Sequence, residues 1–573
     1  MMLTHRVVAV IAALLLAAIV CTSSCDKVGV TRFYQRGMVV TASPVASEIG
    51  RDIIRRGGNA FDAAVAVCFA MAVTYPQAGN IGGGGFAVLR DGSGGEVSVL
   101  DFRETAPEAA TRDMFLDSAG EVVAGLSTRG ALAAGVPGTV AGMYALWQRY
   151  GTMKWADLVT AAARLADTGF TVDKFLAREF NDYREGLSEY AETSRLFLPN
   201  GITPQAGERL LQPDLARSLN AIAVDGPGAF YTGMIADSII ACMQGHGGLI
   251  SYADLERYQP VWREPLHYKF DSLDIYSVPP PSSGGVIVGQ ILKLLEPYDL
   301  SQYSADSPEY IELFCEAARL AFADRAEHLG DPAFYNVPST LLDPRYLAER
   351  RALISREHAG NSAETGPGNP WKYESDHTTH VSICDSDGNM VAVTTTINEL
   401  FGSGLVVQGA GFLLNNEMDD FAIKPGHPNT WGLVGNEANA VAPGKRMLSS
   451  MSPTLILKED RPFMILGSPG GSKIITTLAE AIINFTRFGL TLDQTADRPR
   501  FHFQWLPDTL YLEQKGYKAA TIQRLIGYGY GVAERTPYGD LKMIYIGPGG
   551  MMTGASDWRC GGLAAGCDVP VMK

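Results

Sequence analysis

The stretch DHTTHVSICDSDGNMVAVTTT, residues 376–396, decides the fold. Apolar and β-branched residues alternate with polar ones around Val381 and Ile383, and a second such run, residues 390–393, ends in three threonines. Between the two runs lie the turn-forming residues 385–389, DSDGN. Two β-branched runs around an Asp/Gly/Asn turn predict a β-hairpin.

The segment before the hairpin, residues 359–370 (AGNSAETGPGNP), is rich in Gly, Pro and Asn and has almost no large apolar residue. This composition is typical of an exposed linker. A linker that runs directly into a strand headed by Thr378 suggests that Thr378 becomes a chain terminus. A threonine hydroxyl needs a base, and a free α-amine of pKa ~7.7–8 on the same residue would supply one. Spacing alone leaves the alternative of an ordinary strand threonine open.

The composition is that of a folded protein with a substantial core, because 46% of the 573 residues are hydrophobic and 19% are charged. The length allows several domains. The formal net charge of −15 argues against a nucleic-acid partner, because binding to a phosphate backbone needs a basic face.

The N-terminus predicts an export signal. His5 and Arg6 precede the apolar residues 7–20, and the small and polar residues 21–25, CTSSC, follow. The apolar run is shorter than the ~20 residues of a membrane-spanning helix. We expect a periplasmic or secreted protein with a signal peptide over residues 1–25. Ordinary cleavage and a lipid anchor at Cys25 both remain open.

The other cysteines predict two different environments. Cys68 and Cys315 lie in apolar helical patterns and are expected to be buried. Cys560 and Cys567 flank a Gly/Ala loop, and a local disulfide between them is consistent with export, although the sequence does not decide it. No spacing resembles a zinc site. His377 and His380 lie on opposite faces of a strand, so neither a metal nor a cofactor is expected.

Hydrophobic periodicity places helices in the first half of the chain and short strands around a late helix. The predicted helices are residues 48–73 (as a pair), 137–147, 155–167, 213–224, 234–245, 286–295, 308–325 and 474–488. The predicted strands besides the hairpin are residues 86–89, 97–102, 405–407, 412–414, 454–457 and 463–466. This order favours a layered α+β fold.

Three further segments could carry chemistry. Residues 467–473, GSPGGSK, place a glycine-rich turn before a helix, where backbone N–H groups suit an oxyanion or a phosphate. The turn lacks the Gly-Lys-Ser/Thr of a phosphate-binding loop, and a plain strand-to-helix turn is the alternative. Residues 448–453, LSSMSP, form a hydroxyl cluster, a kind of segment that is more often a solvated turn. The Asp419–Asp420 pair is either a surface pair or half of an ammonium site.

Eight segments together carry a family resemblance. They are GGNAFDAAVA (57–66), GNIGGGGF (79–86), DFRETAP (101–107), VPPPSSGG (278–285), TTHVSICDSDGN (378–389), LLNNEMDDF (413–421), LSSMSPT (448–454) and GSPGGSKIITT (467–477). In this order they closely resemble the γ-glutamyltransferase (γ-glutamyltranspeptidase) family of N-terminal-nucleophile hydrolases. The resemblance covers nearly the whole chain after the signal.

The resemblance implies a four-layer αββα sandwich and a proenzyme that cleaves itself between His377 and Thr378. Residues 26–377 would form a large subunit with a flexible linker at about 359–377. Residues 378–573 would form the small catalytic subunit, and the two products would stay together as a heterodimer.

The resemblance also assigns the catalytic groups. Thr378 would be the nucleophile, with its new amine as the base, and Thr396 would hydrogen-bond to that amine or hydroxyl. Gly470 and Gly471 match the oxyanion hole of the family, where loss of one donor costs ~10²–10³ in rate. Trp431, in the loop over residues 424–434, occupies the position of a lid residue that is usually tyrosine.

The implied substrate is a γ-glutamyl zwitterion. Its α-carboxylate would bind Arg103 with help from Ser449 and Ser450. Its α-ammonium would bind Asn398, Glu417 and Asp420. The expected activity is hydrolysis or transfer of the γ-glutamyl group of glutathione and related compounds, through a γ-glutamyl-threonine ester, to water or to an amino-acid or peptide acceptor. Related cephalosporin acylases act on a glutaryl group without the amine, and the two acidic residues favour γ-glutamyl because glutaryl would leave them unpaired.

Overall fold

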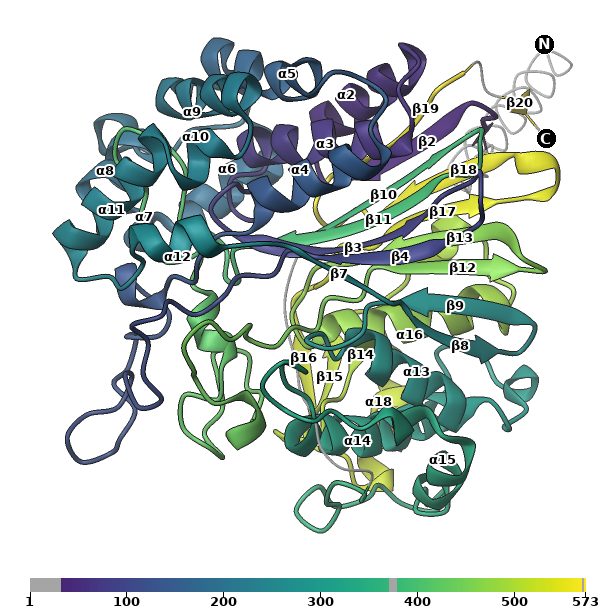
Figure 1. The fold of residues 1–573 in the computed structure, drawn as a ribbon. Helices are drawn as coiled ribbons and strands as arrows, with labels where there is room; N and C mark the ends of the chain where they lie inside the picture. The colour runs from purple at the N-terminus through teal and green to yellow at the C-terminus, as the bar shows by residue number, and fades with distance from the viewer. Residues whose placement is uncertain (1–31, 370–378, 569–570, 573) are drawn as a thin grey trace, which may run out of the picture.

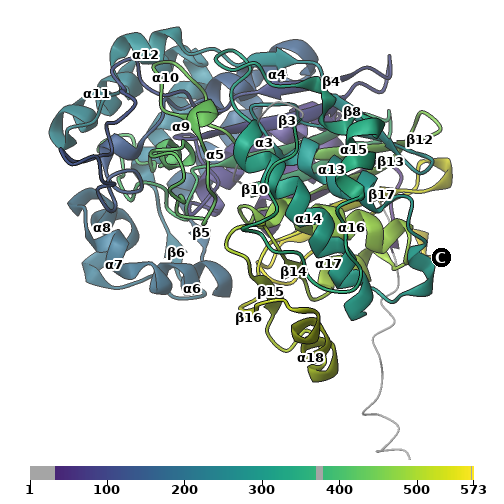
Figure 2. The same ribbon diagram turned by 90° about the horizontal axis from the view of Figure 1, so that it is seen from below.

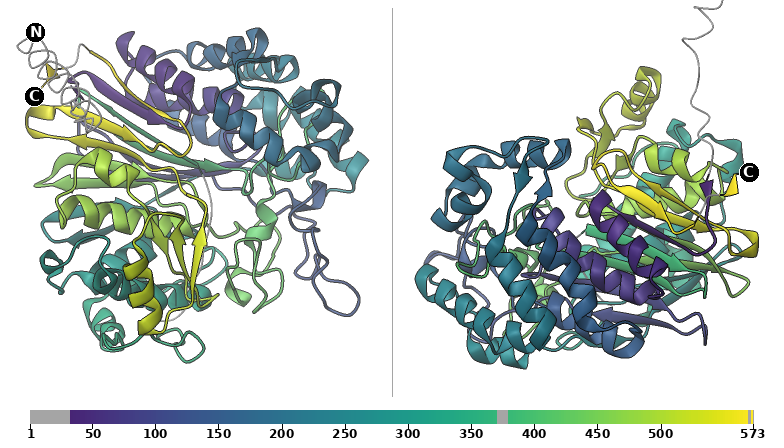
Figure 3. Two further views of the ribbon diagram at one scale, coloured as in Figure 1. Left: turned by 180° about the vertical axis from the view of Figure 1, so that it is seen from behind. Right: turned by 90° about the horizontal axis from the view of Figure 1, so that it is seen from above.

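Residues 32–369, 379–568 and 571–572 are described by the computed structural model (Figure 1). Two β-sheets pack face to face, and helices cover the outer face of each sheet, as the view from behind in Figure 3 also shows. The expected four-layer αββα sandwich is therefore confirmed.

The hairpin lies at the centre of the first sheet. β10 (Thr379–Asp385) pairs antiparallel with β11 (Met390–Thr396), in a register that places Val381 opposite Val393. The seven strands follow the order β19 (Leu563–Gly566), β2 (Gly37–Thr41), β10, β11, β3 (Gly84–Arg90), β4 (Val97–Asp101) and β7 (Val261–Arg263). Val381 and Val393 face the helices, whereas Ala392 faces the second sheet. This alternation is the one that the sequence pattern predicts.

The second sheet has six strands. Their order is β18 (Met552–Ser556), β17 (Lys542–Ile546), β13 (Arg461–Gly467), β12 (Thr454–Lys458), β9 (Leu273–Ser277) and β8 (Leu266–Phe270). Between the sheets, Phe86 and Val88 of the first pack with Leu455, Ile465 and Ile544 of the second. Both sheets are therefore buried on both faces, which explains their long apolar runs.

Two sets of helices cover the sandwich. On the side of the first sheet lie α2 (Pro44–Arg55), α3 (Ala60–Thr74), α4 (Thr139–Tyr150), α5 (Trp155–Thr168), α6 (Lys174–Asp182), α7 (Arg184–Ser188), α8 (Ala191–Phe197), α9 (Pro213–Asp225), α10 (Gly228–Tyr231), α11 (Met234–His246) and α12 (Tyr252–Arg257). On the other side lie α13 (Gly284–Leu295), α14 (Pro308–His328), α15 (Pro344–Arg351), α16 (Lys473–Thr486), α17 (Leu492–Asp497) and α18 (Ala519–Tyr528). Figure 2 shows α13 with α14 and α16 beside it. No helix among the described residues is long and apolar enough to cross a membrane.

The central helix α3 shows why the sequence folds in this way. Asn59 caps its first turn and forms a reciprocal capping box with Asp62. Every residue from Ala60 to Thr74 is buried, which matches a helix that is apolar all round and packs between the sheet and its neighbours. All the predicted helices are present.

Two predicted strands are wrong. Residues 405–407 and 412–414 form only an isolated bridge between Val406 and Leu413. Glycines around them, Gly404, Gly409 and Gly411, have φ of +76°, +79° and +77°, so the chain turns where the apolar runs suggested extension.

The cysteine predictions have mixed outcomes. Cys68 and Cys315 are buried, as expected. Cys560 and Cys567 are both free, so they do not form the disulfide that their spacing allowed. The strand β19 lies between them, and its four extended residues span roughly 13 Å, more than the ~5.5–6 Å between the Cα atoms of a disulfide.

The two sheets come close together at His380. Its buried ring lies 2.9 Å from Thr394 Oγ1 and 3.0 Å from Ser382 Oγ. Burial lowers the pKa of His380 to about 3, so the ring is neutral. Gly467, the last residue of β13, packs against this ring, and a Cβ there would lie 2.3 Å from His380 Nδ1. Gly467 therefore allows the close approach that leads into the Gly470–Gly471 turn.

We predict that Gly467→Ala destabilises the protein by about 1–3 kcal/mol, because the new methyl group overpacks against the His380 ring. Thermal unfolding measures this as a lower Tm. The control is Gly245→Ala, at an exposed position in α11 where a Cβ meets nothing within 4 Å. This variant should gain roughly 0.5–1 kcal/mol. Equal Tm values for the two variants would contradict the close-approach argument.

Candidate active site

A buried arginine forms the centre of the candidate site. Arg103 follows β4, and its side chain is 0% exposed. Its guanidinium donates to Glu417 Oε2 at 2.5 Å and to Asp420 Oδ2 at 2.5 Å. It also donates to the backbone oxygens of Met447 at 3.2 Å and Leu448 at 3.1 Å. The structure thus brings the predicted carboxylate-binding residue together with two of the predicted ammonium-binding residues.

A short 3-10 helix, η5 (Glu417–Asp420), positions the two acids. Residues i and i+3 of a 3-10 helix lie on the same face, so both carboxylates point to one guanidinium. A third acid, Glu104, is fully buried, and its Oε2 lies 3.6 Å from Arg103 Nη1. The cluster therefore holds one cation among three carboxyl groups.

Burial and charge act in opposite directions on these groups. Burial raises the pKa of Glu417, and the attraction of Arg103 with a hydrogen bond to Thr396 offsets only part of this. Burial and repulsion from Glu417 raise the pKa of Glu104 well above its ordinary value. Burial lowers the pKa of Arg103, but attraction to its three acids outweighs this and raises it overall. The guanidinium is therefore charged at every physiological pH.

Several buried polar atoms beside the cluster have no hydrogen-bond partner among the described residues. They are Glu417 Oε1, both carboxylate oxygens of Glu104, and Ser450 Oγ. Ser449 Oγ, in contrast, accepts the Met451 N–H at 3.1 Å. Glu104 Oε2 reaches only ion-pair distance of Arg103. Buried polar atoms normally have hydrogen-bond partners, so these oxygens leave hydrogen-bonding capacity for a polar ligand.

The end of β11 connects this cluster to the predicted lid. Thr396 Oγ1 accepts the Asn398 N–H at 2.7 Å. Asn398 has a left-handed φ of +70°, a conformation that asparagine tolerates better than most residues. Its Nδ2 donates to Asn416 O at 3.0 Å, and its Oδ1 accepts from Trp431 Nε1 at 3.0 Å. Asn398 is therefore fixed between the acidic helix and the lid residue.

A cavity of about 250 Å³ opens beside Asn398 and Trp431. Gly470 and Gly471 line it, with φ of +130° and +68°, immediately before α16. These left-handed angles favour glycine, and a turn at a helix start can present backbone N–H groups to an oxyanion. The structure thus places the predicted oxyanion turn and the predicted lid in one cavity.

The family model described as gamma-glutamyltranspeptidase matches residues 46–567. The chain belongs to the γ-glutamyltranspeptidase family. It is 45% identical over 527 residues to the glutathione hydrolase proenzyme of Escherichia coli, covering 92% of this chain and 90% of that protein.

Two solved structures of related proteins resemble the fold. The cephalosporin acylase from Bacillus halodurans aligns with a TM-score of 0.82 at 26% identity, covering 94% of this chain and 97% of its own. The γ-glutamyltranspeptidase of Helicobacter pylori aligns with a TM-score of 0.56 at 42% identity, covering 57% of this chain and 93% of its own.

The predicted cleavage site of this family member, His377 and Thr378, lies outside the described residues. β10 begins at Thr379, which pairs with Thr395, the neighbour of Thr396. The structure brings Arg103 together with Glu417 and Asp420, and Asn398 together with Trp431. The roles of His377, Thr378 and the other site residues remain predictions.

Sequence reasoning missed three residues of the site. Glu104 directly follows Arg103 in the DFRETAP segment, and that adjacency was the only available signal. Cys560 and Tyr75 line the cavity with Gly470 and Gly471. They come from opposite ends of the chain, so no local pattern links them.

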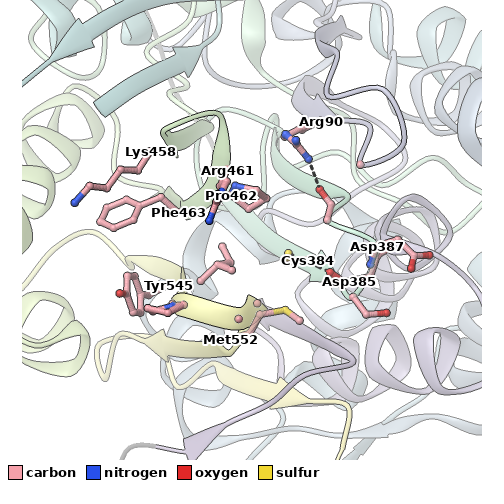
Figure 4. Close-up of a pocket in the computed structure, with 18 of the residues that line it drawn as sticks. Arg90, Cys384, Asp385, Asp387, Lys458, Arg461, Pro462, Phe463, Tyr545 and Met552 are labelled. Carbon is pink, nitrogen blue, oxygen red and sulfur yellow. Dashed lines mark hydrogen bonds between the residues drawn. The ribbon is translucent and has the colours of Figure 1, made fainter. Parts of the chain in front are cut away.

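A second cavity, of about 500 Å³, lies at the other ends of β10 and β13 (Figure 4). Arg90 donates to Gly388 O there at 2.8 Å. The lining includes Arg90, Lys458 and Arg461, and also Asp385, Asp387 and Glu459, so its formal charges balance. It contains none of the predicted site residues, and we do not assign the chemistry to it.

We predict that Arg103→Met destabilises the protein by about 3–5 kcal/mol, because it leaves three carboxyl groups buried without a cation. The pKa values of Glu104 and Glu417 in the folded state are already raised, and loss of the cation raises them further above the unfolded values. The loss of stability should therefore be larger at pH 8 than at pH 5. Chemical denaturation at the two pH values measures this.

Arg195→Met is the matched control for this variant. Arg195 also bonds to two acids, Glu192 and Asp214, but its side chain is 53% exposed. Its loss should cost at most about 1 kcal/mol. A deficit of Arg103→Met that does not change with pH would contradict the buried-charge account.

Proposed function

We propose that the chain is a self-processing γ-glutamyl hydrolase and transferase that acts on glutathione and related γ-glutamyl amides. The observation that carries the proposal is the buried cluster of Arg103, Glu417 and Asp420. Asn398, which bonds to the residue before Glu417, connects this cluster to the Gly470–Gly471 cavity. One cation and adjacent anions complement the α-carboxylate and α-ammonium of a γ-glutamyl group.

Binding would exchange ion-pair partners within the cluster. The substrate α-carboxylate would take guanidinium hydrogen bonds of Arg103 and the hydroxyls of Ser449 and Ser450. The α-ammonium would bind Glu417 and Asp420, which the exchange leaves in need of a cation, with Asn398 beside them. A hydrogen bond to a charged group contributes roughly 1.5–3 kcal/mol.

The chemistry follows from an N-terminal threonine. The free amine of Thr378 would accept the proton of its own hydroxyl while the oxygen attacks the γ-carbonyl carbon. The N–H groups at Gly470 and Gly471 would stabilise the resulting oxyanion. The C–N bond then breaks, the departing amine takes the proton, and a γ-glutamyl-threonine ester remains. Water, or an amino-acid or peptide amine, would cleave the ester and regenerate Thr378.

The proposal also covers cleavage of the chain and its export from the cytoplasm. Cleavage before Thr378 would give two chains that stay together. Export rests on the pattern of His5, Arg6 and the apolar residues 7–20. Cell fractionation tests export, and recovery of the enzyme in the cytoplasm alone would refute it.

We predict that Thr378→Ala remains a single chain on a denaturing gel and releases no glutamate from glutathione, whereas the wild-type protein gives two chains and releases glutamate. Thr378→Ser is the control, because it keeps a hydroxyl and an amine at the same place and should still process and turn over, more slowly. A wild-type protein that stays in one piece and is inactive on γ-glutamyl anilides would refute the proposed function.

We also predict a strong preference for γ-glutamyl over glutaryl anilide, on the order of 10³–10⁴ in kcat/KM, because glutaryl lacks the ammonium. Glu417→Gln should lower this ratio at least about tenfold. Protonation of Glu417 removes the charge that binds the ammonium, so the preference of the wild-type enzyme should weaken on acidification. Because burial raises the pKa of Glu417, this weakening should begin at a higher pH than for an ordinary glutamate.

Glu96→Gln is the control for this ratio, since Glu96 is a largely exposed acid that pairs with Arg149. It should leave the ratio unchanged. Equal rates on the two anilides would show instead a related acylase with another acyl preference.

A further inference from the structure

A third cavity, of about 440 Å³, lies next to the candidate active site. Trp431 lines both this cavity and the one that holds Gly470 and Gly471. The lining is Thr430, Trp431, Gly432, Lys473, His502, Gln504, Pro507, Tyr511, Arg535, Thr536 and Tyr538. The two cavities therefore adjoin each other at Trp431.

The cavity is electrostatically one-sided. Lys473 and Arg535 are its cationic side chains, and none of the described lining residues is Asp or Glu. His502 adds no charge, because burial lowers its pKa to about 3. The chain as a whole has a formal net charge of −15. The described lining of this cavity is positive instead, with two cationic side chains and no acidic one.

The surrounding structure positions the cationic groups. β15 (Leu510–Glu513) and β16 (Val532–Arg535) pair in parallel, and the Arg535 guanidinium lies over the Tyr511 ring, 4.8 Å from its centroid. Glu513, which pairs with Arg535 in register, instead bonds with its carboxylate to Arg559 at 2.6 and 2.9 Å. The cross-strand acid is thus committed elsewhere, and Arg535 faces the cavity.

The position of Lys473 relates the cavity to the chemistry. It is the first residue of α16, two residues after Gly471, so the two Cα atoms lie within about 7 Å. The carboxylate of a dipeptide leaving group lies at a similar distance from the scissile nitrogen, since an extended residue spans about 3.3–3.6 Å. A substrate whose acyl carbon is at the glycine turn can therefore place a carboxylate near Lys473 and Arg535.

We propose that this cavity binds the free carboxylate of the amine portion of the substrate, with Arg535 and Lys473 as specificity-determining residues. During acylation it would hold the C-terminal carboxylate of the peptide that leaves. During transfer it would hold the carboxylate of the amino-acid or peptide acceptor. Both amines must occupy the same place, because the transfer step is the reverse of the acylation step with another amine. The inference rests on the proposed function and extends it from the acyl group to the amine.

The test compares three γ-glutamyl donors on the processed wild-type enzyme. Glutathione has the carboxylate, glutathione C-terminal amide lacks it, and γ-glutamyl-p-nitroanilide has a leaving group without any carboxylate. We expect kcat/KM for glutathione to exceed that for its amide by roughly three- to tenfold. The factor is modest because Arg535 is exposed, and ion pairs of exposed side chains contribute little binding free energy. Glycylglycine should exceed glycylglycinamide as acceptor by a similar factor.

Variants then test whether Arg535 and Lys473 cause the preference for glutathione over its amide. Arg535→Gln should reduce the glutathione-to-amide ratio towards one and leave the anilide kcat/KM unchanged, whereas Arg535→Lys should retain the preference. The control is Arg461→Gln, an exposed arginine in the charge-balanced cavity of Figure 4, which should change nothing. Two chains on a denaturing gel verify that each variant has matured.

The outcomes separate the two proposals. Wild-type enzyme that hydrolyses the anilide but treats glutathione and its amide equally would overturn the carboxylate site and leave the γ-glutamyl activity intact. A preference that survives the double variant Lys473→Gln/Arg535→Gln would also overturn it. Inactivity of the wild-type enzyme on all three donors would refute the proposed function itself.

Discussion

The ion pairs of Arg103 are the constraint on which the site depends. A buried guanidinium is costly unless it is fully bonded, and here its partners come from three separate segments: η5, the backbone at residues 447–448, and Glu104. These segments can meet only if β4 delivers Arg103 beneath the loop that carries the acids. The charge cluster thus fixes the relative positions of segments more than 300 residues apart.

The same constraint bears on proteolytic processing. A cut before Thr378 would place Arg103 on one product and Glu417 with Asp420 on the other. The first sheet also interleaves the two products, because β10 pairs with β2 and β11 pairs with β3. Separation would break central strand ladders and leave a buried cation opposite unpaired carboxylates. A nick at this point can therefore create a new terminus without dissolving the fold.

The sequence predicts those parts of the fold that local periodicity determines. The hairpin and the long helices were correct because their apolar residues repeat at the spacing of a strand or a helix. The predicted strands over residues 405–407 and 412–414 were wrong, because short apolar runs between left-handed glycines resemble strands in sequence. β8 (LHYKF) and β9 (LDIYS) were missed because their short mixed patterns become strands only in the sheet, where β9 pairs with β12 and β8 pairs with β9.

The site divides in the same way. The family motifs identified Arg103, Glu417, Asp420 and the glycine turn as single positions. That the cation and the acids bond to one another is a tertiary fact, since residues 103 and 417 have no local relation in sequence. Glu104 and the Lys473–Arg535 cavity were missed for this reason. Each depends on which strands and loops converge, and no motif records that.

Trp431, the predicted lid residue, occupies a position where the family resemblance leads us to expect tyrosine. A lid tyrosine would offer one O–H donor, and the indole Nε1–H of Trp431 supplies a donor to Asn398 Oδ1 at 3.0 Å. This hydrogen bond fixes the Trp431 side chain against Asn398. Trp431 also lines both the cavity with the Gly470–Gly471 turn and the neighbouring cavity with two cationic side chains. Under the proposed function, the residue at this position would therefore contact both halves of the amide, the γ-glutamyl group and the amine.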